Sequence, residues 1–394
     1  AKIAFKGAFD WQPGTAKGRL MEGAEAIALG ALAADCRFAA FYPMSPATGI
    51  LTNMVKHGDD LPLVVEQAED EIAAVNMTTG ASFAGVRALT ATSGGGFSLM
   101  VEGLGLAAIT ETPLVIIDAQ RPGPATGLPT RTAQADLLFA IHASQDEFPR
   151  FVFAPRSMDE AFAIMARAFH LTQKYQVPAI VMVDQFLNDS WFVSAEPFRL
   201  PDAIECFTVS DVDLPDPASY RRFEVTDDGI SPRALPCKGR ALVKACSDEH
   251  TPDGHMTEVA AERVRMVNKR AAKWPAMRAE MVPPRVLHGK SKTLLVGWGS
   301  TEGALHEAVA RLRADGQGVG CVSFNGLWPF PAEAVSAALG EAERFIMVEQ
   351  NGTAQLGQLI RGQTGMTAAG AILKYDGRPF FPQDICDGYY SQQG

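Results

Sequence analysis

One group of acidic residues lies where it could have a chemical function and not only a structural one. Four carboxylates precede or open a predicted helix directly after a predicted strand at 63–65: Glu66, Glu69, Asp70 and Glu71. Acidic residues in a first turn offset the helix dipole, which is sufficient to explain most such runs. Glu71 is the exception, because the apolar residues at 72–75 predict that this turn faces the protein interior. A buried carboxylate is costly unless it meets a partner or a ligand, so Glu71 is a candidate functional residue.

A glycine-rich turn follows the next predicted strand, at 86–92. It reads Ser93-Gly94-Gly95-Gly96 and opens a second helix. Open α/β sheets bind their ligands at the carboxyl ends of their strands, which is where this turn lies. Ser93 and Gly94 are therefore candidate ligand-binding residues. The alternative is a tight turn that needs glycine for conformation or close approach alone.

Two further loops begin where predicted strands end. After the strand at 38–41 the chain reads Tyr42-Pro43-Met44-Ser45-Pro46, and its two prolines restrict the backbone around Met44 and Ser45. This loop either presents the Ser45 hydroxyl to a ligand or is simply a stiff turn.

The second of these loops follows the strand at 114–118 and begins with Arg121. Proline and glycine stiffen it, and a guanidinium group there suits a carboxylate ligand, which it can bind through two hydrogen bonds. Alternatively, Arg121 pairs with a structural acid such as Asp118 or Asp136. Thr130 and Arg131, farther along the loop, could contact a second carboxylate on a dicarboxylic ligand.

Alternating strands and helices must position these residues. Besides the three strands that precede the candidate residues, the pattern predicts a helix at 22–35 and strands at 151–154 and 179–183. This rhythm is typical of a parallel sheet with helices on both faces, so the fold class is α/β. We assign residues 21–197 to this domain and residues 1–20 to an irregular N-terminal linker.

The rest of the chain divides in two. Residues 198–290 are rich in proline, aspartate and arginine and lose regular periodicity, except for a basic helical stretch at 258–281. A long segment of this kind is functional or a linker, and we interpret it as an extended arm. The pattern of residues 291–394 predicts a second, smaller α/β domain, which begins with a strand, a glycine turn and an amphipathic helix.

The glycine turn of the second domain suggests one alternative function. Gly297, Gly299 and Gly303 resemble a dinucleotide-binding pattern but miss its spacing by one residue. The next predicted strand, 319–324, ends in Asn325, where an acid should bind the ribose. A nucleotide-binding transferase or dehydrogenase is therefore a minor alternative.

Composition excludes several classes of protein. The net charge of −10 and the lack of a basic tract argue against binding to nucleic acid. No apolar run is long enough to cross a membrane, and no signal-peptide pattern is present, so a cytoplasmic location is expected. The six cysteines lie far apart, and His250 and His255 are the only close histidines, so no metal or cluster site is expected in this chain.

Longer motifs resemble one family. Glu71 to Gly80 with the TSGGG turn is similar to the pyrimidine-binding domain of thiamine-diphosphate enzymes. More narrowly, the segments YPMSPATG, EDEIAAVNMTTGAS, TATSGGGFSLM, ETPLVIIDAQRPGPATGLPTRT and KYDGRPF resemble the α subunit of 2-oxoacid:ferredoxin oxidoreductases, of the 2-oxoglutarate type. The resemblance covers nearly the whole chain. It implies that residues 291–394 form a domain like the transketolase C-terminal domain, largely architectural, and that the arm embraces a neighbouring subunit.

The resemblance also implies residue roles. Glu71 would hydrogen-bond N1′ of the aminopyrimidine and activate the cofactor, with Pro43, Met44, Ser93 and Gly94 around it. Arg121 would bind the C1 carboxylate of the 2-oxoacid. Ser45 stands where the family carries threonine, and Gly95 where relatives commonly have proline. Ser45 keeps the hydroxyl and so keeps the expected contact with substrate and cofactor.

A missing motif implies a partner. Thiamine-diphosphate enzymes hold the diphosphate through Mg²⁺ at a Gly-Asp-Gly motif, and this sequence has none. The resemblance implies a β subunit that supplies this motif, the Mg²⁺ and a 4Fe-4S cluster, in a dimer of αβ pairs. The expected reaction converts 2-oxoglutarate and coenzyme A to succinyl-CoA, CO₂ and reduced ferredoxin. It is reversible, so it could serve oxidation or CO₂ fixation in a reductive TCA cycle.

Some alternatives stay open on the sequence. Pyruvate or a branched-chain 2-oxoacid could replace 2-oxoglutarate, and the chain could be a non-catalytic scaffold for its partner. A complete non-oxidative enzyme such as an acetolactate synthase would need Gly-Asp-Gly in the same chain. Some relatives carry an extra domain fused ahead of this region, and the chain is expected to lack it.

Overall fold

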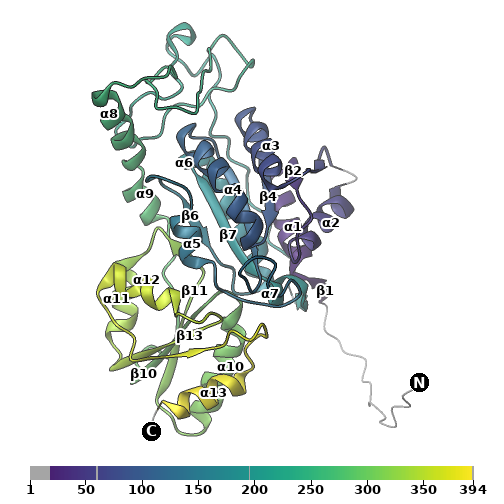
Figure 1. Ribbon diagram of the computed structural model, residues 1–394, viewed down its shortest axis with the longest axis vertical. Helices are drawn as coiled ribbons and strands as arrows, with labels where there is room; N and C mark the ends of the chain where they lie inside the picture. The colour runs from purple at the N-terminus through teal and green to yellow at the C-terminus, as the bar shows by residue number, and fades with distance from the viewer. Residues whose placement is uncertain (1–17, 59–60, 195, 393–394) are drawn as a thin grey trace, which may run out of the picture.

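A computed structural model describes residues 18–58, 61–194 and 196–392. Figure 1 shows two α/β units stacked along the long axis, with an irregular arm above the first unit. Most of the expected N-terminal linker, residues 1–17, lies outside the described residues. No helix among those described is long and apolar enough to cross a membrane.

The first unit is built on a sheet that has seven strands in the described part of the chain. Every neighbouring pair is parallel except the pair formed by β12 and β6. In spatial order the strands are β12 (Gly326–Trp328), β6 (Phe151–Phe153), β7 (Pro178–Asp184), β5 (Leu114–Gln120), β4 (Ala88–Thr92), β2 (Phe38–Phe41) and β3 (Val64–Gln67).

Helices cover both faces of this sheet, as parallel pairing requires. On one face α1, α2 and α6 bury a cluster that includes Ile27, Ile50 and Phe169. On the other face α3, α4 and α5 bury Val75, Phe97 and further apolar side chains. The helices are α1 (Gly23–Ala33), α2 (Thr48–Gly58), α3 (Glu71–Phe83), α4 (Gly94–Ile109), α5 (Leu137–His142), α6 (Met158–Tyr175) and α7 (Gln185–Asp189).

The second unit has a smaller sheet, in the order β14-β13-β10-β11-β9, with only β9 antiparallel. Its strands are β9 (Arg285–Leu287), β10 (Thr293–Trp298), β11 (Val319–Phe324), β13 (Arg344–Glu349) and β14 (Gly370–Leu373). Its helices are α10 (Glu302–Ala314), α11 (Ala332–Gly340), α12 (Gln355–Thr364) and α13 (Pro382–Ser391), with a 3₁₀ turn η2 (Gly299–Thr301).

The two units are joined by more than the covalent chain. Strand β12 leaves the second unit and pairs with β6 at the edge of the first sheet. One apolar cluster includes Phe97 and Met182 of the first unit together with Trp298 and Met347 of the second. The second unit therefore contributes both a strand and core side chains to the first.

The arm attaches to its own chain through a buried ionic cluster. Lys269 Nζ and Lys273 Nζ donate to the two carboxylate oxygens of Glu111, at 2.5 and 2.6 Å, and all three side chains are at most 1% exposed. Arg222 donates to the carbonyl oxygen of Glu111 at 2.7 Å. The helical part of the arm is α8 (Ala260–Ala271) and α9 (Trp274–Ala279), and a 3₁₀ turn η1 (Pro217–Ser219) precedes it.

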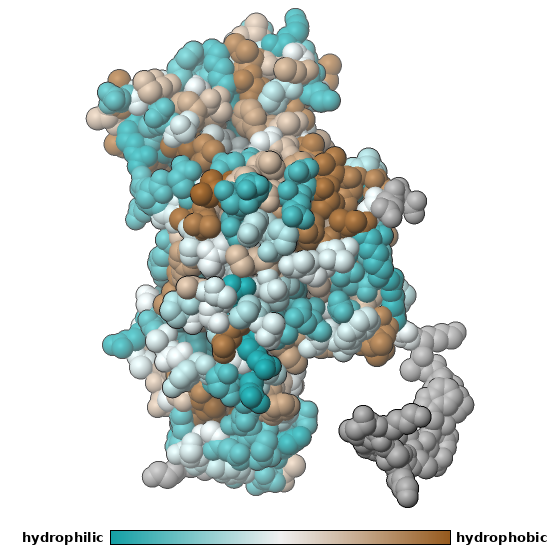
Figure 2. Space-filling view, turned by 45° about the vertical axis from the view of Figure 1, so that its right-hand side comes forward, coloured by the Kyte–Doolittle hydropathy of each residue, from teal (hydrophilic) through white to brown (hydrophobic). Residues whose placement is uncertain are grey.

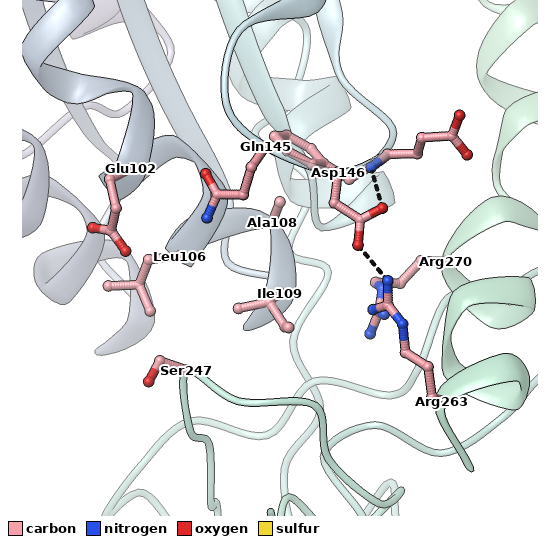
Figure 3. Close-up of a pocket in the computed structure, with 12 residues that line it drawn as sticks. Glu102, Leu106, Ala108, Ile109, Gln145, Asp146, Ser247, Arg263 and Arg270 are labelled. Carbon is pink, nitrogen blue, oxygen red and sulfur yellow. Dashed lines mark hydrogen bonds and ion pairs between the residues drawn. The ribbon is translucent and has the colours of Figure 1, made fainter. Parts of the chain in front are cut away.

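A cleft separates the arm from the outer half of α4. Figure 3 shows Glu102, Leu106 and Ile109 of α4 on one side and Arg263 and Arg270 of α8 on the other. Both arginines are already paired, because each binds Glu249 and Arg263 also binds Asp146. The arginines that line the cleft therefore help to attach the arm to the first unit. The cleft lies on the half of α4 that is away from its glycine-rich end.

The structure differs from the sequence-based expectations at a few elements. The single helical stretch expected at 258–281 is two helices, since Pro275 lacks an N–H and its ring would clash with a continuing helix. Three short strand pairings were not anticipated: β1 (Arg19–Glu22) with β8 (Trp191–Ser194), β9 with β11, and β12 with β6.

The glycine pattern of the second unit has a structural explanation. Gly299 has φ of +56°, and a Cβ there would lie 3.0 Å from Nε2 of Gln134 in the first unit. Gly299, Ser300 and Thr301 are all buried. The turn is therefore packed against the first unit rather than open to a nucleotide phosphate.

Candidate functional site

Glu71 lies at the amino end of α3 and is 3% exposed. The preceding Asp70 caps the helix by accepting a hydrogen bond from the backbone N–H of Ala73 at 2.7 Å. Glu71 is therefore free of the capping role that explains acidic residues at such positions. Its Oε1 has no hydrogen-bond partner among the described residues, which is costly for a buried carboxylate and is typical of a ligand site.

Glycines let α4 approach this carboxylate closely. A Cβ on Gly96 would lie 2.4 Å from Glu71 Oε1 and 2.0 Å from Thr92 Oγ1. One on Gly103, two turns farther along, would lie 2.6 Å from Val75. Gly96 is thus required by close packing against Glu71 and Thr92, and it brings the start of α4 against the start of α3.

The start of α4 is rich in unpartnered polar groups. Ser93 precedes the helix but makes no side-chain cap, and its Oγ, like Thr92 Oγ1, is buried without a partner among the described residues. Gly94 is half-buried, whereas Gly95 is exposed, and the nearest atom to a Cβ on Gly95 would be 3.7 Å away. Free amide groups at a helix amino end favour electron-rich ligand atoms.

Arg121 and Ser45 are brought together from neighbouring parts of the sheet edge. Arg121 Nη1 donates to the carbonyl oxygen of Ser45 at 2.7 Å, and Ser45 itself is exposed. Among the described residues Arg121 forms no ion pair, so the alternative pairing with Asp118 or Asp136 is wrong for this structure. Pro43 is exposed and Met44 is half-buried in the same loop.

The segment 121–135, which we call the Arg121 loop, folds back on itself. The backbone N–H of Leu128 donates to the carbonyl oxygen of Pro122 at 2.9 Å. Gly127 has φ of +53°, and a Cβ there would lie 1.7 Å from that same oxygen, so only glycine fits. Thr130 and Arg131 are exposed near the end of the loop.

The second unit holds the Arg121 loop in place. Thr132 N–H donates to the carbonyl oxygen of Gly377 at 3.2 Å, in the KYDGRPF motif. Gln134 donates from Nε2 to the carbonyl oxygen of Trp298 at 2.7 Å, and its backbone exchanges hydrogen bonds with Gln350 and Asn351. The domain expected to be largely architectural therefore shapes the candidate site directly.

A buried carboxylate organises the segment that holds this loop. Glu349 is fully buried and accepts hydrogen bonds from Trp298 Nε1, Asn351 Nδ2 and the backbone N–H groups of Leu356 and Gly357, at 2.9 to 3.2 Å. Burial raises the pKa of Glu349 above its ordinary value although these donors oppose the shift. The VEQNGTAQL motif thus folds around Glu349 and presents Gln350 and Asn351 to the Arg121 loop.

Two aspartates near the site were not predicted as functional. Asp118, on β5, is fully buried and neither carboxylate oxygen has a partner among the described residues. Burial and the charge of Asp136 raise the pKa of Asp118 well above its ordinary value. Burial also raises the pKa of Asp136 to about 6. Asp118 precedes the Arg121 loop in the sequence and Asp136 follows it, so no local residue pattern predicts that their charges interact.

Comparison with known proteins places the chain in one family. A family model described as pyruvate flavodoxin/ferredoxin oxidoreductase, thiamine diphosphate-binding, matches residues 29–269, and one for pyruvate:ferredoxin oxidoreductase core domain II matches residues 291–385. The chain is 39% identical over 382 residues to the α subunit of 2-oxoacid:ferredoxin oxidoreductase 1 of Sulfurisphaera tokodaii, covering 93% of this chain and 60% of that one. The chain belongs to the 2-oxoacid:ferredoxin oxidoreductase family, as an α subunit.

Other members of the 2-oxoacid:ferredoxin oxidoreductase family are similar over different lengths. The KorA subunit of 2-oxoglutarate synthase from Methanothermobacter thermautotrophicus is 32% identical, with 93% of this chain and 96% of that one covered. The solved 2-oxoglutarate:ferredoxin oxidoreductase from Magnetococcus marinus superposes with a TM-score of 0.88 at 32% identity, over 96% of this chain and 65% of that one. The chain spans about 60% of the length of the first curated relatives it matches.

Family membership confirms part of what the sequence predicted. The resemblance to the α subunit of 2-oxoacid:ferredoxin oxidoreductases is confirmed, and so is the thiamine-diphosphate enzyme fold with two α/β units. The first unit is a thiamine-diphosphate-binding domain. The geometry gathers Glu71, Ser93 and Gly94 at one sheet edge and joins Arg121 to Ser45, whereas the functional roles of these residues stay predictions.

Proposed function

We propose that this chain is the α subunit of an enzyme that oxidatively decarboxylates 2-oxoglutarate, with coenzyme A, to succinyl-CoA, CO₂ and reduced ferredoxin. The observation that carries the proposal is the buried Glu71 carboxylate. Its Oε1 lies close to the Gly96 backbone and has no hydrogen-bond partner among the described residues. The similarity to KorA and to the Magnetococcus marinus enzyme supports 2-oxoglutarate as the substrate.

The residues around Glu71 fit the aminopyrimidine of thiamine diphosphate. An unpartnered buried carboxylate supplies the acceptor, or in its acid form the donor, that the ring N1′ atom needs. Pro43, Met44, Ser93 and Gly94 line the same edge of the sheet in this proposal. When bound, thiamine diphosphate would supply the nucleophilic carbon that attacks the 2-oxo group and the electron sink for the loss of CO₂. Glu71 would hold and exchange the proton at N1′.

Arg121 and Ser45 would bind the C1 carboxylate of the substrate. Arg121 Nη1 is bonded to Ser45, whereas its Nε is without a partner among the described residues. A guanidinium with donors to spare suits a carboxylate in two hydrogen bonds. Thr130 and Arg131, exposed at the end of the Arg121 loop, are positioned in our proposal to meet the second carboxylate of 2-oxoglutarate.

A partner subunit would complete the site. The sequence lacks Gly-Asp-Gly, so the diphosphate, its Mg²⁺ and a 4Fe-4S cluster are assigned to a β subunit. The outer faces of α3 and α4 are apolar beside Glu71, with Ile72, Met77 and Leu99 between 42 and 51% exposed. Figure 2 shows apolar side chains gathered on the upper right of the molecule. An exposed apolar face next to half of a site is typical of a subunit interface.

The remaining parts of the proposal concern assembly and location. We propose a dimer of αβ pairs, in which the arm contacts a neighbouring subunit, with domain boundaries at residues 20, 197 and 290. The six cysteines are free thiols, which persist in a reducing compartment, so we place the enzyme in the cytoplasm. Electrons would pass one at a time through the partner's cluster to ferredoxin, in the direction that the cell's electron potential sets.

The test is to produce the chain with its candidate β subunit and to measure activity under anaerobic conditions. We expect reduction of a viologen dye that requires 2-oxoglutarate, coenzyme A and thiamine diphosphate. Greater activity with pyruvate or a branched-chain 2-oxoacid would change the substrate assignment only. Full activity of this chain without a partner would contradict the shared site, and thiamine-diphosphate binding without any turnover would favour a scaffolding role.

A further inference from the structure

Two aspartates, the buried Asp118 and the half-buried Asp136, lie at the base of the Arg121 loop, one before it and one after it. Asp118 precedes the loop on β5, and Asp136 follows it just before α5. The side chain of Gln120, which shares its strand face with Asp118, accepts a hydrogen bond from the backbone N–H of Asp136 at 3.2 Å. The two ends of the loop are therefore held side by side, and we call Asp118 and Asp136 the loop-base pair.

The loop-base pair is enclosed but has few partners. Both oxygens of Asp118 and Oδ2 of Asp136 lack hydrogen-bond partners among the described residues. A Cβ on Gly94 would lie 2.4 Å from Asp136 Oδ2, so this carboxylate is pressed against the start of α4. Two ionised carboxylates in such a place would repel each other with little water to screen them.

The surrounding charges do not neutralise the loop-base pair. On β4, Thr92 is the register partner of Asp118, and it has a hydroxyl rather than a charge. On β7, Asp184 is already bonded to Ser300 and to the N–H of Leu187. The nearest carboxylate on α3 is Glu71, and Arg121 donates to Ser45 instead of to either aspartate. A proton is the remaining means of compensating the pair.

We propose that Asp118 and Asp136 share a single proton and thereby tie together the two ends of the Arg121 loop, so that they act as positioning residues for substrate binding. In this state one carboxyl group donates to the other across the base of the loop. Loss of the shared proton would leave two like charges and would loosen the loop that carries Arg121, Thr130 and Arg131. The inference rests on the proposed function only for the statement that this loop binds substrate.

The direction of the pH effect follows from the shifts in pKa. Burial raises the pKa of Asp136 to about 6, and burial together with the charge of Asp136 raises the pKa of Asp118 well above its ordinary value. A raised folded-state pKa contributes stability that is present at low pH and is lost as pH rises through that pKa. Because both shifts are upward, the pair holds a proton to higher pH than ordinary aspartates do, and the loop is expected to loosen as pH rises through the raised pKa of the pair.

Amide hydrogen exchange over residues 121–135 tests the proposal without any activity measurement. In the αβ enzyme, after correction for intrinsic exchange rates, the loop should lose protection as pH is raised from neutral to alkaline. Asp118→Asn should abolish that pH dependence, because its amide can donate permanently to Asp136. Asp136→Asn should do the same if the first variant does not fold. Asp202→Asn, an exposed aspartate in the arm, is the matched control and should behave like the wild type.

Two further readouts distinguish the shared proton from a merely structural role. The infrared difference spectrum between the wild type and Asp118→Asn should contain the carbonyl band of a neutral buried carboxyl group. The KM for the 2-oxoacid should rise with pH in the wild type more than kcat falls, and this rise should disappear in Asp118→Asn. Equal loss of loop protection at alkaline pH in Asp118→Asn and wild type would overturn the proposal. Failure of the kinetic result alone, with exchange and infrared results as expected, would contradict the substrate assignment instead.

Discussion

Arg121 and Ser45 are joined by a hydrogen bond from Nη1 of the arginine to the carbonyl oxygen of the serine, at 2.7 Å. The bond links the loops that follow β5 and β2, two strands with β4 between them. One guanidinium group can thus fix the Pro43–Pro46 turn and still present further N–H groups to a ligand. The link also means that a change at Arg121 affects both the proposed carboxylate contact and the position of Ser45.

Replacing Arg121 by lysine should show whether substrate binding depends on the positive charge alone or also on the hydrogen-bonding geometry of the guanidinium group. Arg121→Lys keeps the positive charge but cannot bond to Ser45 and to a carboxylate in the same way. Losing one charged hydrogen bond of about 1.5–3 kcal/mol corresponds to a roughly 10- to 150-fold rise in KM for the 2-oxoacid. Steady-state kinetics of the αβ enzyme would measure this. Arg361→Lys, an exposed arginine on α12, should leave KM unchanged, and an unchanged KM in both would remove Arg121 from substrate binding.

Glu71→Gln should separate catalysis from folding. The variant keeps the shape of the side chain but cannot exchange a proton as a carboxyl group does, so turnover should fall by at least about 100-fold. Thermal stability should be equal or higher, because an unpartnered buried carboxylate is costly to the folded state. Calorimetry and the dye-reduction assay together check both statements. Normal turnover would contradict the role assigned to Glu71.

The adjacent glycines of the TSGGG turn provide a matched pair of substitutions. Gly96→Ala would place a Cβ 2.0 Å from Thr92 Oγ1 and 2.4 Å from Glu71 Oε1, so α4 or Glu71 must move. We expect a loss of about 1–3 kcal/mol in the free energy of unfolding and weaker thiamine-diphosphate binding. Gly95→Ala meets only the carbonyl oxygen of Ala125, at 3.7 Å, and should change stability by less than about 0.5 kcal/mol. Chemical denaturation and calorimetric titration with the cofactor would compare the two.

The ionic cluster that attaches the arm predicts a dependence on acid pH. Burial opposes ionisation of Glu111, but the charges of Lys269 and Lys273 outweigh it and hold its pKa far below the ordinary value. Its contribution to stability is therefore present above its unfolded-state pKa of about 4.5 and is lost as pH falls below that value. Glu111→Gln should destabilise the protein by about 3–5 kcal/mol at neutral pH, since two buried ammonium groups lose their counter-ion.

The control for this cluster lies on the same helix that leads to Glu111. Glu102 is exposed on α4, and Glu102→Gln should change stability by less than about 0.5 kcal/mol. The difference between Glu111→Gln and wild type should shrink as pH is lowered below about 4.5. A difference that stays constant down to about pH 3 in denaturant titrations would show that the Glu111 charge does not stabilise the arm.

Local pattern was sufficient to predict much of this molecule. The strands and helices of both sheets follow hydrophobic runs and periodicity, and Glu71 was distinguished from Asp70 by the apolar residues after it. Asp70 indeed caps α3, and Glu71 is buried. These features depend on residues within a turn or two of one another, which is the range over which sequence patterns carry information.

The rest depends on contacts between distant parts of the chain. Gln134 meets Gln350 and Asn351 more than 200 positions away, and the side chain of Gln120 bonds to the backbone N–H of Asp136 only because the Arg121 loop closes. The strand β12 has three residues and no distinctive alternation, so its pairing with β6 could not be predicted from its own sequence. Long-range relations of this kind appear only when the fold is known.

That short strand also has a consequence for solubility. Without β12, strand β6 would be the edge of the large sheet and would expose unpaired N–H and C=O groups. Bare edges of this kind recruit strands from other molecules. A fragment that stops before residue 326 would keep the whole Glu71 region yet present such an edge, so it should self-associate. The second unit therefore covers an edge of the first sheet as well as shaping its loop.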